Sequence, residues 1–600
     1  MKKLLSYQIV DYLERRKVKY VFGLCGHTVI AMLDALSKSK IIKYISFRHE
    51  QIAATAADGY ARVSKKAAVV MTHLGPGLTN AVTGVANAAL DSIPLVVIAG
   101  DVPSYYYGKH PHQEINMHCD GSQYDIYKPF VKRAWRLDTP ELMPEILDKA
   151  FRLAESGRPG PVLISVPMDM FSKEVDESCF ERTYKDSHIT VKPALSREIA
   201  KEIARMLIEA KNPLIHIGGQ IVYHDASEEL TELVDFLDVP VTRTLMGQGG
   251  ISDTHPLLVG MTGFWGTKFV NGKSTGADCI LAIGTRMTEA DSSSWYDGVT
   301  FSSKTKFIQI DMDASEIGRN YPVEIGAVAD PKQALKEILE ASKELMPEGI
   351  DRPELRAEIL KYKLEFKESN RDISIDGRFP MTPQRILKDV REVFPDDGLI
   401  FTDVGWNKNG VGQQFEITKP DTIFHPGGLA TMGFGSAAIL GAKLAALDKK
   451  VITLIGDGGF GTNPSVLAAA VEQNIPVVWV VMNNYAFGTI AGLEGGAYNH
   501  CFGTVFYTPD GNKYNPEWSE VAKAYGVKSK KITSADEFKE AFREAVESDE
   551  PYLLDVPMEN IPVPTDGLWN INDIYNPKEN VIKGRLIFGE ALKSYHKPLI

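Results

Sequence analysis

Short runs of β-branched and apolar residues alternate with helical patterns in three separate stretches of this 600-residue chain. The runs have the length and composition of strands that are buried on both faces of a parallel sheet, and they end in glycine-rich turns. A chain that alternates strands and helices in this way covers both faces of each sheet with helices. The pattern therefore predicts an α/β protein with three doubly wound parallel-sheet domains.

The boundaries follow from where the pattern changes. The first domain is expected over residues 1–175, with the strands KAAVVMTH and PLVVIAG, and the central domain over 190–342, with NPLIHIGG, CILAIGT and KFIQIDMD. The third domain is expected over 376–560, with LIFTDVG, VITLIGD and VVWVVMNN. The charged stretch between 343 and 380 indicates a solvated helical linker, and nothing in the periodicity of the tail, residues 561–600, indicates a fold.

The charge balance and the cysteines narrow the kinds of partner. There are 66 Lys and Arg residues against 78 Asp and Glu, a net charge of −12, which argues against binding to nucleic acid or to an anionic membrane. Small metabolites are the expected partners. The five cysteines show no metal-binding spacing, the N-terminal stretch is interrupted by charge, and no apolar run reaches the length of a membrane span. We therefore expect a cytoplasmic location.

An aspartate and two asparagines follow neighbouring strands of the third domain. VITLIGD runs directly into the turn that contains Asp457, and VVWVVM ends at Asn483 and Asn484. Because ligands bind at the carboxyl ends of strands in open α/β sheets, these side chains are expected close together. Their oxygens suit a hard divalent cation such as Mg²⁺, held on a phosphate ligand next to a helix N-terminus. The alternative is that Asp457 caps a helix and the asparagines form a turn.

A second candidate site lies in the first domain, in FRHEQIAATAADGYAR, residues 47–62. Glu50 is expected where a strand meets an alanine-rich helix, with Phe47 and Ile52 close in sequence. A carboxyl group in such an apolar setting is desolvated and suits acid–base chemistry. The alternative is a surface glutamate at the start of a helix.

The GDG and NN motifs, separated by 24 residues, resemble the cofactor signature of thiamine-diphosphate enzymes. The resemblance implies thiamine diphosphate in a site shared by a pyrimidine-binding first domain and a diphosphate-binding third domain. It also implies Mg²⁺ bound by Asp457, Asn484 and the main-chain carbonyl of Ala486. Glu50 matches the carboxylate that hydrogen-bonds the pyrimidine ring and favours its imino form, which serves as the internal base.

GGLATMGFGSAAILGAK, residues 427–443, is similar to the segment that touches the pyrimidine from the third domain. Met432 matches the bulky residue that bends the cofactor, and Ala430 matches a carbonyl that holds the 4′-amino group; core packing is the alternative for Met432. The cofactor-binding residues that the resemblance implies are Gly26, Glu50, Ala430, Met432, Gly456, Asp457, Gly458, Gly459, Asn484, Ala486, Phe487 and Gly488.

Over residues 1–555 the order of the motifs resembles the acetolactate synthase branch of this family. The shared segments include VFGLCGHTVIAMLDAL, the RHE motif, GPGLTNAVTGVANAALDSIPLVVIAG, GRPGPVLISVP and the stretch from GDG to NN. The resemblance implies a transferase that decarboxylates a 2-oxo acid and adds the carbanion to a second carbonyl compound.

The substrate side departs from that branch. His112 stands where acetolactate synthases have Phe, and His73 and Leu74 precede the GPG motif where they have Ser. Leu493 takes the place of the Trp that selects the acceptor, and the GQHQ segment becomes GWNK at 405–408. His27 resembles a residue of benzaldehyde-lyase-like members.

These departures set the catalytic candidates, which are Glu50, His27, His73, His112 and Gln113. The histidines could shuttle protons or hold a carboxylate, although each could instead be a packed, neutral core residue. They favour a decarboxylase or 2-hydroxyacyl lyase as the alternative function. A non-enzymatic homologue is disfavoured because Glu50, Asp457 and Asn484 are all present.

Three further expectations concern cofactor, assembly and tail. TLMGQGG at 244–250 and IGTRMTEADSSSW at 283–295 resemble the FAD-binding region of acetolactate synthases, but the GARFDDR-type pattern is only partly kept, so FAD stays an open alternative. Because the site is divided between two domains that come from different chains in this family, the resemblance implies a homodimer at minimum and allows a homotetramer. The tail around Trp569 is a candidate lid over the site, which would exclude water.

Overall fold

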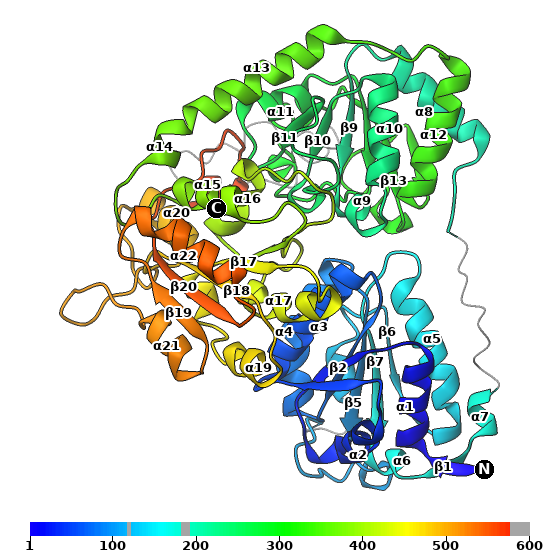
Figure 1. Ribbon diagram of the computed structural model, residues 1–600. Coiled ribbons are helices and arrows are strands. Elements are labelled where there is room, and N and C mark those ends of the chain that lie inside the picture. The colour runs from blue at the N-terminus through cyan, green and yellow to red at the C-terminus, as the bar shows by residue number, and fades with distance from the viewer. Residues whose placement is uncertain (117–121, 182–191, 576–600) are drawn as a thin grey trace, which may run out of the picture.

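The computed structural model describes residues 1–116, 122–181 and 192–575, and it contains three six-stranded sheets in which all neighbouring strands are parallel (Figure 1). Cys119 lies outside the described residues. The first sheet has the order β3 (Lys43–Ser46), β2 (Tyr20–Gly23), β4 (Ala68–Thr72), β5 (Leu95–Asp101), β7 (Val162–Pro167), β6 (Arg133–Arg136). Alternate residues of its strands point to opposite faces, so one face packs on α1 (Leu5–Arg15), α2 (Ile30–Lys38) and α5 (Met143–Glu155), and the other on α3 (Glu50–Ser64) and α4 (Pro76–Leu90).

The central sheet has the order β11 (Leu258–Met261), β10 (Val241–Arg243), β9 (Pro213–Ile217), β12 (Cys279–Ile283), β13 (Lys306–Asp311), β14 (Ile325–Val328). Its main core is shared with α8 (Arg197–Glu209), α10 (Ser227–Leu237) and α12 (Pro331–Leu345). The linker that follows forms α13 (Pro353–Ser369) and α14 (Arg371–Ile375), in which Ile359 is the one buried residue. The linker is therefore helical, as expected, but α13 packs on the central domain through Ile359 and through Tyr362, whose ring stacks on that of Phe269.

The third sheet has the order β16 (Ile423–Phe424), β15 (Leu399–Thr402), β17 (Val451–Gly456), β18 (Val478–Asn483), β20 (Tyr552–Pro557), β19 (Lys528–Lys531). One face packs on α15 (Pro383–Val393) and α22 (Ala535–Glu547). The other packs on α17 (Phe434–Ala445), α19 (Val466–Glu472) and α21 (Trp518–Ala524). The predicted fold class, α/β with three doubly wound parallel sheets, is therefore confirmed.

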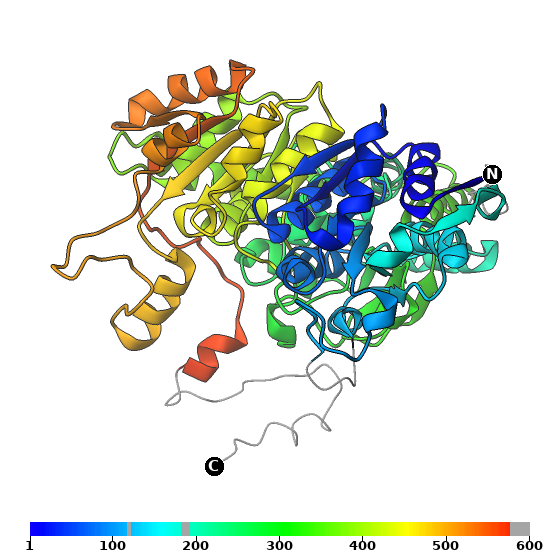
Figure 2. The same ribbon diagram turned by 90° about the horizontal axis from the view of Figure 1, so that it is seen from below.

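Helices α3 and α17 join the first and third domains, and their apolar residues belong to one shared core (Figures 1 and 2). Gly59 lies against the main chain of Ala438, and Gly441 lies against that of Ala56, so the two helices run antiparallel and their backbones approach closely. A Cβ atom at either glycine would collide with the opposite helix. The small-residue faces AATAADGYA and GFGSAAILGA thus pack against each other inside one chain.

The described part of the tail contacts both the central and the third domain, and Gln413 Nε2 of the third domain donates a hydrogen bond to the main-chain oxygen of Pro564 at 2.6 Å. Asp566 accepts a hydrogen bond from the main-chain N–H of Lys268 at 2.7 Å, and the Trp569 ring lies 5.0 Å from that of Phe264, centroid to centroid. A short helix, α23 (Asn570–Tyr575), follows. The role of the tail as a lid over the thiamine site stays a prediction. Among the described residues, none of the helices has both the length and the apolar character that a membrane crossing requires.

Candidate active site

Glu50 lies at the carboxyl edge of the first sheet, where β3 ends and α3 begins. Its residue surface is only 4% exposed, which contradicts the alternative of a surface helix-start glutamate. The side-chain amide of Asn80, on α4, donates a hydrogen bond to Glu50 Oε2 at 3.0 Å. The other oxygen, Oε1, faces Gly77, where an added Cβ would lie 3.1 Å from it. The carboxylate is therefore held in a narrow space that a larger residue at position 77 would close.

The three predicted histidines of the first domain lie together at the same edge. The rings of His27 and His73 are 4.5 Å apart, and those of His27 and His112 are 6.1 Å apart and stacked. His73 is buried, and its ring nitrogens contact the Thr28 hydroxyl and Gln113 Oε1, both at 2.8 Å. Because an amide oxygen such as Gln113 Oε1 can only accept a hydrogen bond, His73 Nε2 carries the hydrogen. His73 Nδ1 then accepts a hydrogen bond from the Thr28 hydroxyl. His73 therefore positions Gln113 in this chain, whereas His27 and His112 are exposed.

Two glycines make this arrangement possible. Gly26 faces the His73 ring so closely that a Cβ atom would overlap it. Gly75 has a φ of +51° and lies against the main-chain oxygen of Gln113, which itself has a φ of +65°. Partial burial lowers the pKa of His27, and His73 and His112 lower it further by charge repulsion. His27 is thus biased toward its neutral form.

Asp457 and Asn484 meet at the carboxyl edge of the third sheet, as expected from the motif. The main-chain N–H groups of Asn484 and Gly458 donate to the Asp457 carboxylate, and Asn515 Nδ2 donates to its Oδ2 at 2.5 Å. Burial raises the pKa of Asp457 to about 6. Its second oxygen, Oδ1, is buried and has no hydrogen-bond partner among the described residues. This orphaned acceptor is the clearest sign that a ligand belongs here.

The rest of the turn is built by close approaches between protein atoms. A Cβ at Gly458 would lie 2.7 Å from the Phe487 ring, and Gly459 faces the Asp403 carboxylate. Gly488 faces the side chains of Asn484 and Asn560. Gly456 ends β17 and precedes the one-turn helix α18 (Asp457–Phe460). The glycines at 458 and 459 therefore make room for Phe487 and Asp403.

The loop that precedes α17 presents the residues matched to the pyrimidine contact. Asp403 is fully buried and accepts hydrogen bonds from the main-chain N–H groups of Gly433, at 3.2 Å, and Gly435, at 2.9 Å. Ala430 has a left-handed φ of +54°, and Met432 is 37% exposed. Met432 is thus not part of the core of this chain, and its side chain can contact a ligand.

Glu50 and Asp457 lie at opposite ends of the helices that join their domains. Arg62, near the end of α3, lies over the Phe434 ring at the start of α17, 4.7 Å from its centroid. Because an α-helix rises 1.5 Å per residue, Glu50 lies about 18 Å along α3 from Arg62. Arg48 pairs at 3.0 Å with Glu472, which ends α19, the helix that follows the Asp457 turn. Within one chain the carboxyl edge of the first sheet thus faces the amino edge of the third.

Three positioning residues were not predicted from the sequence. Asn80 holds Glu50, Asp403 holds the loop with Met432, and Asn515 bridges Asp457 and Asn483 Oδ1, the latter at 3.0 Å. Asp403 stands directly after a strand, in LIFTD, and this position could have identified it, whereas Asn80 lies in the second turn of α4. Asn515 comes from a loop far from the motif, and nothing in its local sequence indicates the contact.

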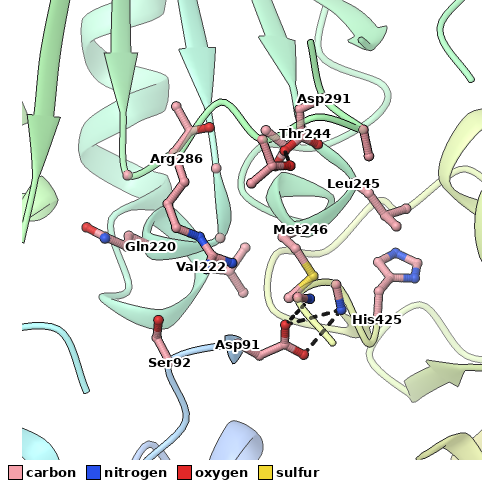
Figure 3. A pocket seen from close by; sticks show the side chains of 18 of the residues that line it. Asp91, Ser92, Gln220, Val222, Thr244, Leu245, Met246, Arg286, Asp291 and His425 are labelled. Atoms are coloured by element: carbon pink, nitrogen blue, oxygen red, sulfur yellow. Dashed lines mark hydrogen bonds between the residues drawn. The ribbon is translucent and has the colours of Figure 1, made fainter. Parts of the chain in front are cut away.

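A cavity of about 480 Å³ lies at the carboxyl edge of the central sheet (Figure 3). It is lined by the turns after β9, β10 and β12, by the end of α4, by loop 425–430 and by Trp569 of the tail. Arg286 points into it from the central domain, while Asp91 accepts hydrogen bonds from the main-chain N–H groups of Gly427 and Gly428 (Figure 3). The regions predicted for a flavin, 244–250 and 283–295, contribute several of its wall residues.

Comparison with known proteins agrees with this architecture. The chain matches the thiamine pyrophosphate enzyme family in three segments: the N-terminal TPP binding domain at residues 5–122, the central domain at 200–338 and the C-terminal TPP binding domain at 403–556. These matches fall on the three sheets.

Individual relatives match nearly the whole chain. A probable acetolactate synthase large subunit of Methanocaldococcus jannaschii is 37% identical, covering 94% of this chain and 94% of the relative. A probable acetolactate synthase large subunit of Methanococcus aeolicus is 36% identical, covering 91% of this chain and 90% of the relative. The acetolactate synthase large subunit of Corynebacterium glutamicum is 32% identical, covering 91% and 85%. With its three matched domains and its buried Glu50 and Asp457, the chain belongs to the thiamine pyrophosphate enzymes, in the branch of the acetolactate synthase large subunits.

Proposed function

We propose that this protein is a thiamine-diphosphate-dependent carboligase of acetolactate synthase type. It decarboxylates a 2-oxo acid and joins the remaining acyl group to a second carbonyl compound. The observation that carries this conclusion is the colinear match, over 91–94% of the chain, to acetolactate synthase large subunits. The burial of Glu50 and Asp457, the residues that we assign to cofactor activation and metal binding, supports it.

The Asp457 edge fits a magnesium ion. A divalent cation there would satisfy the orphaned Oδ1 of Asp457 and would keep this carboxylate ionised despite its burial. We infer that the side chains of Asp457 and Asn484 and the main-chain carbonyl of Ala486 bind Mg²⁺. Because Mg²⁺ retains water and takes phosphate oxygens as further ligands, three protein ligands are sufficient.

The residues of the site have separate roles. Thiamine diphosphate, when bound, would supply the thiazolium carbon and the electron sink that decarboxylation of a 2-oxo acid requires. Glu50 exchanges a hydrogen bond and a proton with the pyrimidine ring, and its burial strengthens that interaction. Met432 packs against the cofactor from the third domain. His27 and His112 face the substrate side and move protons to or from its carbonyl oxygen, with Gln113 held in place by His73.

We further infer that the active unit is at least a homodimer, with a tetramer compatible with the same contact. Glu50 and the Asp457 edge are separated within one chain by the length of α3, so one cofactor cannot bridge them there. A two-fold partner brings the Glu50 edge of one chain to the Asp457 edge of the other, and it forms two equivalent sites.

A specific observation favours a second candidate activity, a decarboxylase or 2-hydroxyacyl lyase. His27, His73 and His112 form one cluster, in which His112 stands where acetolactate synthases carry Phe. Leu493, which is half-buried on α20 (Gly488–Tyr498), stands where they carry Trp. A proton donor next to the reacting carbon favours release of an aldehyde over addition to a second oxo acid.

Product analysis separates the two activities. With pyruvate as the only substrate, we expect acetolactate, measured by its conversion to acetoin and by mass spectrometry. Acetaldehyde as the main product would support the decarboxylase instead. If neither forms, a panel of longer 2-oxo acids and aldehydes identifies the donor.

For the cavity in Figure 3 we propose FAD as the bound group. It lies where doubly wound sheets bind nucleotides, and the flavin-like segments of the sequence line it. The expected result is a yellow protein that shows the visible absorption band of a bound flavin after gentle purification. A colourless protein that gains no flavin absorbance on incubation with FAD would refute this proposal.

A further inference from the structure

Lys408 is a buried lysine that pairs with no carboxylate among the described residues. It lies in the first turn of α16 (Trp406–Gln414), is 7% exposed and lines the cavity of about 480 Å³. Its ammonium donates a long hydrogen bond of 3.4 Å to the main-chain oxygen of Pro426. No ion pair joins it to a carboxylate in the part of the chain that the structure describes. A buried ammonium is costly unless an anion accompanies it.

The three carboxylates whose charges raise the pKa of Lys408 already accept hydrogen bonds from other groups. Asp91 accepts hydrogen bonds from the Arg62 side chain and from two main-chain N–H groups. Asp403 accepts hydrogen bonds from the main-chain N–H groups of Gly433 and Gly435. Asp291 accepts from the Thr288 hydroxyl at 2.6 Å. Burial lowers the pKa of Lys408, and these three carboxylates only partly offset that effect. Among the described residues, the Lys408 ammonium therefore has nearby negative charge but no directly paired carboxylate.

The cavity wall is positive as a whole. Arg62, Lys65 and Arg158 pair with carboxylates. Arg286 and Lys408, in contrast, line the cavity from the central and the third domain without a carboxylate partner among the described residues. The nearby His425 is affected by the same positive charges. Burial lowers its pKa, and the charges of Arg243, Lys408 and Arg62 lower it further.

We propose that Lys408 binds a negatively charged or negatively polarised group of the ligand that fills this cavity, and that it makes the cavity select nucleotides over uncharged nucleosides. The ligand class is a nucleoside diphosphate compound, because the cavity lies beside Gly218 and Gly219 at the carboxyl edge of β9, where doubly wound sheets bind such molecules. The inference shares its cavity with the flavin proposal and does not depend on carboligation.

The test compares binding of ADP, FAD and adenosine to the full-length protein by calorimetry. Thiamine diphosphate and Mg²⁺ are kept in excess, so that the Asp457 site is filled. The variant is Lys408→Gln, which restores the residue of the GQHQ segment and is therefore expected to fold. Lys443→Gln is the matched control, since Lys443 is a buried lysine of the same domain that bonds main-chain oxygens of Leu447 and Lys449 outside the cavity. Thermal unfolding checks both variants.

We expect Lys408→Gln to weaken binding of FAD, ADP or both at least tenfold, with adenosine changed less than twofold and Lys443→Gln without effect. Weaker binding of ADP to the variant would place Lys408 at the diphosphate. Weaker binding of FAD alone would place it at the flavin ring. The proposal is overturned if the wild-type protein binds neither ADP nor FAD. It is also overturned if the variant binds both as tightly as the wild type, or if adenosine is weakened equally. Pyruvate turnover, measured separately, reports on the carboligase proposal.

Discussion

Glu50→Gln is expected to reduce turnover by roughly a thousandfold or more while thiamine diphosphate still binds, because the substitution removes proton exchange at the pyrimidine and little contact area. The amide keeps the size of the side chain and one acceptor oxygen. It cannot take part in the change of protonation that a carboxyl group allows. The measurement is kcat on the donor substrate, together with the cofactor dissociation constant from fluorescence quenching.

The matched control for this variant is Glu472→Gln. Glu472 is a half-exposed glutamate that pairs with Arg48 two residues before Glu50, and it does not contact the predicted site. Its substitution should leave both turnover and cofactor binding within about twofold, as expected for an exposed pair. Near wild-type turnover of Glu50→Gln would show that the proton chemistry assigned to Glu50 is wrong.

Asp457→Asn is expected to have its largest effect on metal and cofactor retention. Replacing a carboxylate ligand of Mg²⁺ should weaken Mg²⁺-dependent binding of thiamine diphosphate by more than the roughly 10- to 100-fold that outer-shell partners contribute. The metal-free variant should be at least as stable as the wild type, because it no longer buries a carboxylate with an unsatisfied oxygen.

Thermal unfolding with and without Mg²⁺ and thiamine diphosphate measures both effects. The cofactor-dependent rise in melting temperature should be lost in Asp457→Asn and kept in Asp549→Asn, a substitution at a 95% exposed side chain of the same domain. A full cofactor-dependent rise in Asp457→Asn would mean that the metal is bound elsewhere.

The fold was predictable because its signals are local. Strands such as VITLIGD and VVWVVM are buried on both faces, so their apolar runs are continuous, and the polar residues that follow them must lie at one sheet edge. The proximity of Asp457 and Asn484 follows from that rule alone.

Contacts between distant segments were not predictable. The hydrogen bond from Asn515 to Asp457 joins a loop and a strand end 58 residues apart, and the Thr28–His73–Gln113 chain joins three loops. The packing of α3 on α17 was open between two arrangements, since small residues permit close approach within one chain or between chains. The position of Trp569 at the central cavity depends on irregular backbone, for which no periodicity exists.

The central claim is that each active site combines Glu50 of one chain with Asp457 of another. Its most direct test is to co-express Glu50→Gln and Asp457→Ala chains with different affinity tags and to isolate the mixed dimers through both tags. Each variant alone should be inactive.

A mixed dimer contains one site with both residues intact and one site with neither. With random pairing in the unfractionated mixture, activity should return to about a quarter of the wild-type value, because half of the dimers are mixed and each of these has one intact site. Purified mixed dimers should therefore show about half of the wild-type activity per dimer. Mixed dimers that form but show no activity would contradict the account and would mean that each site is built within a single chain.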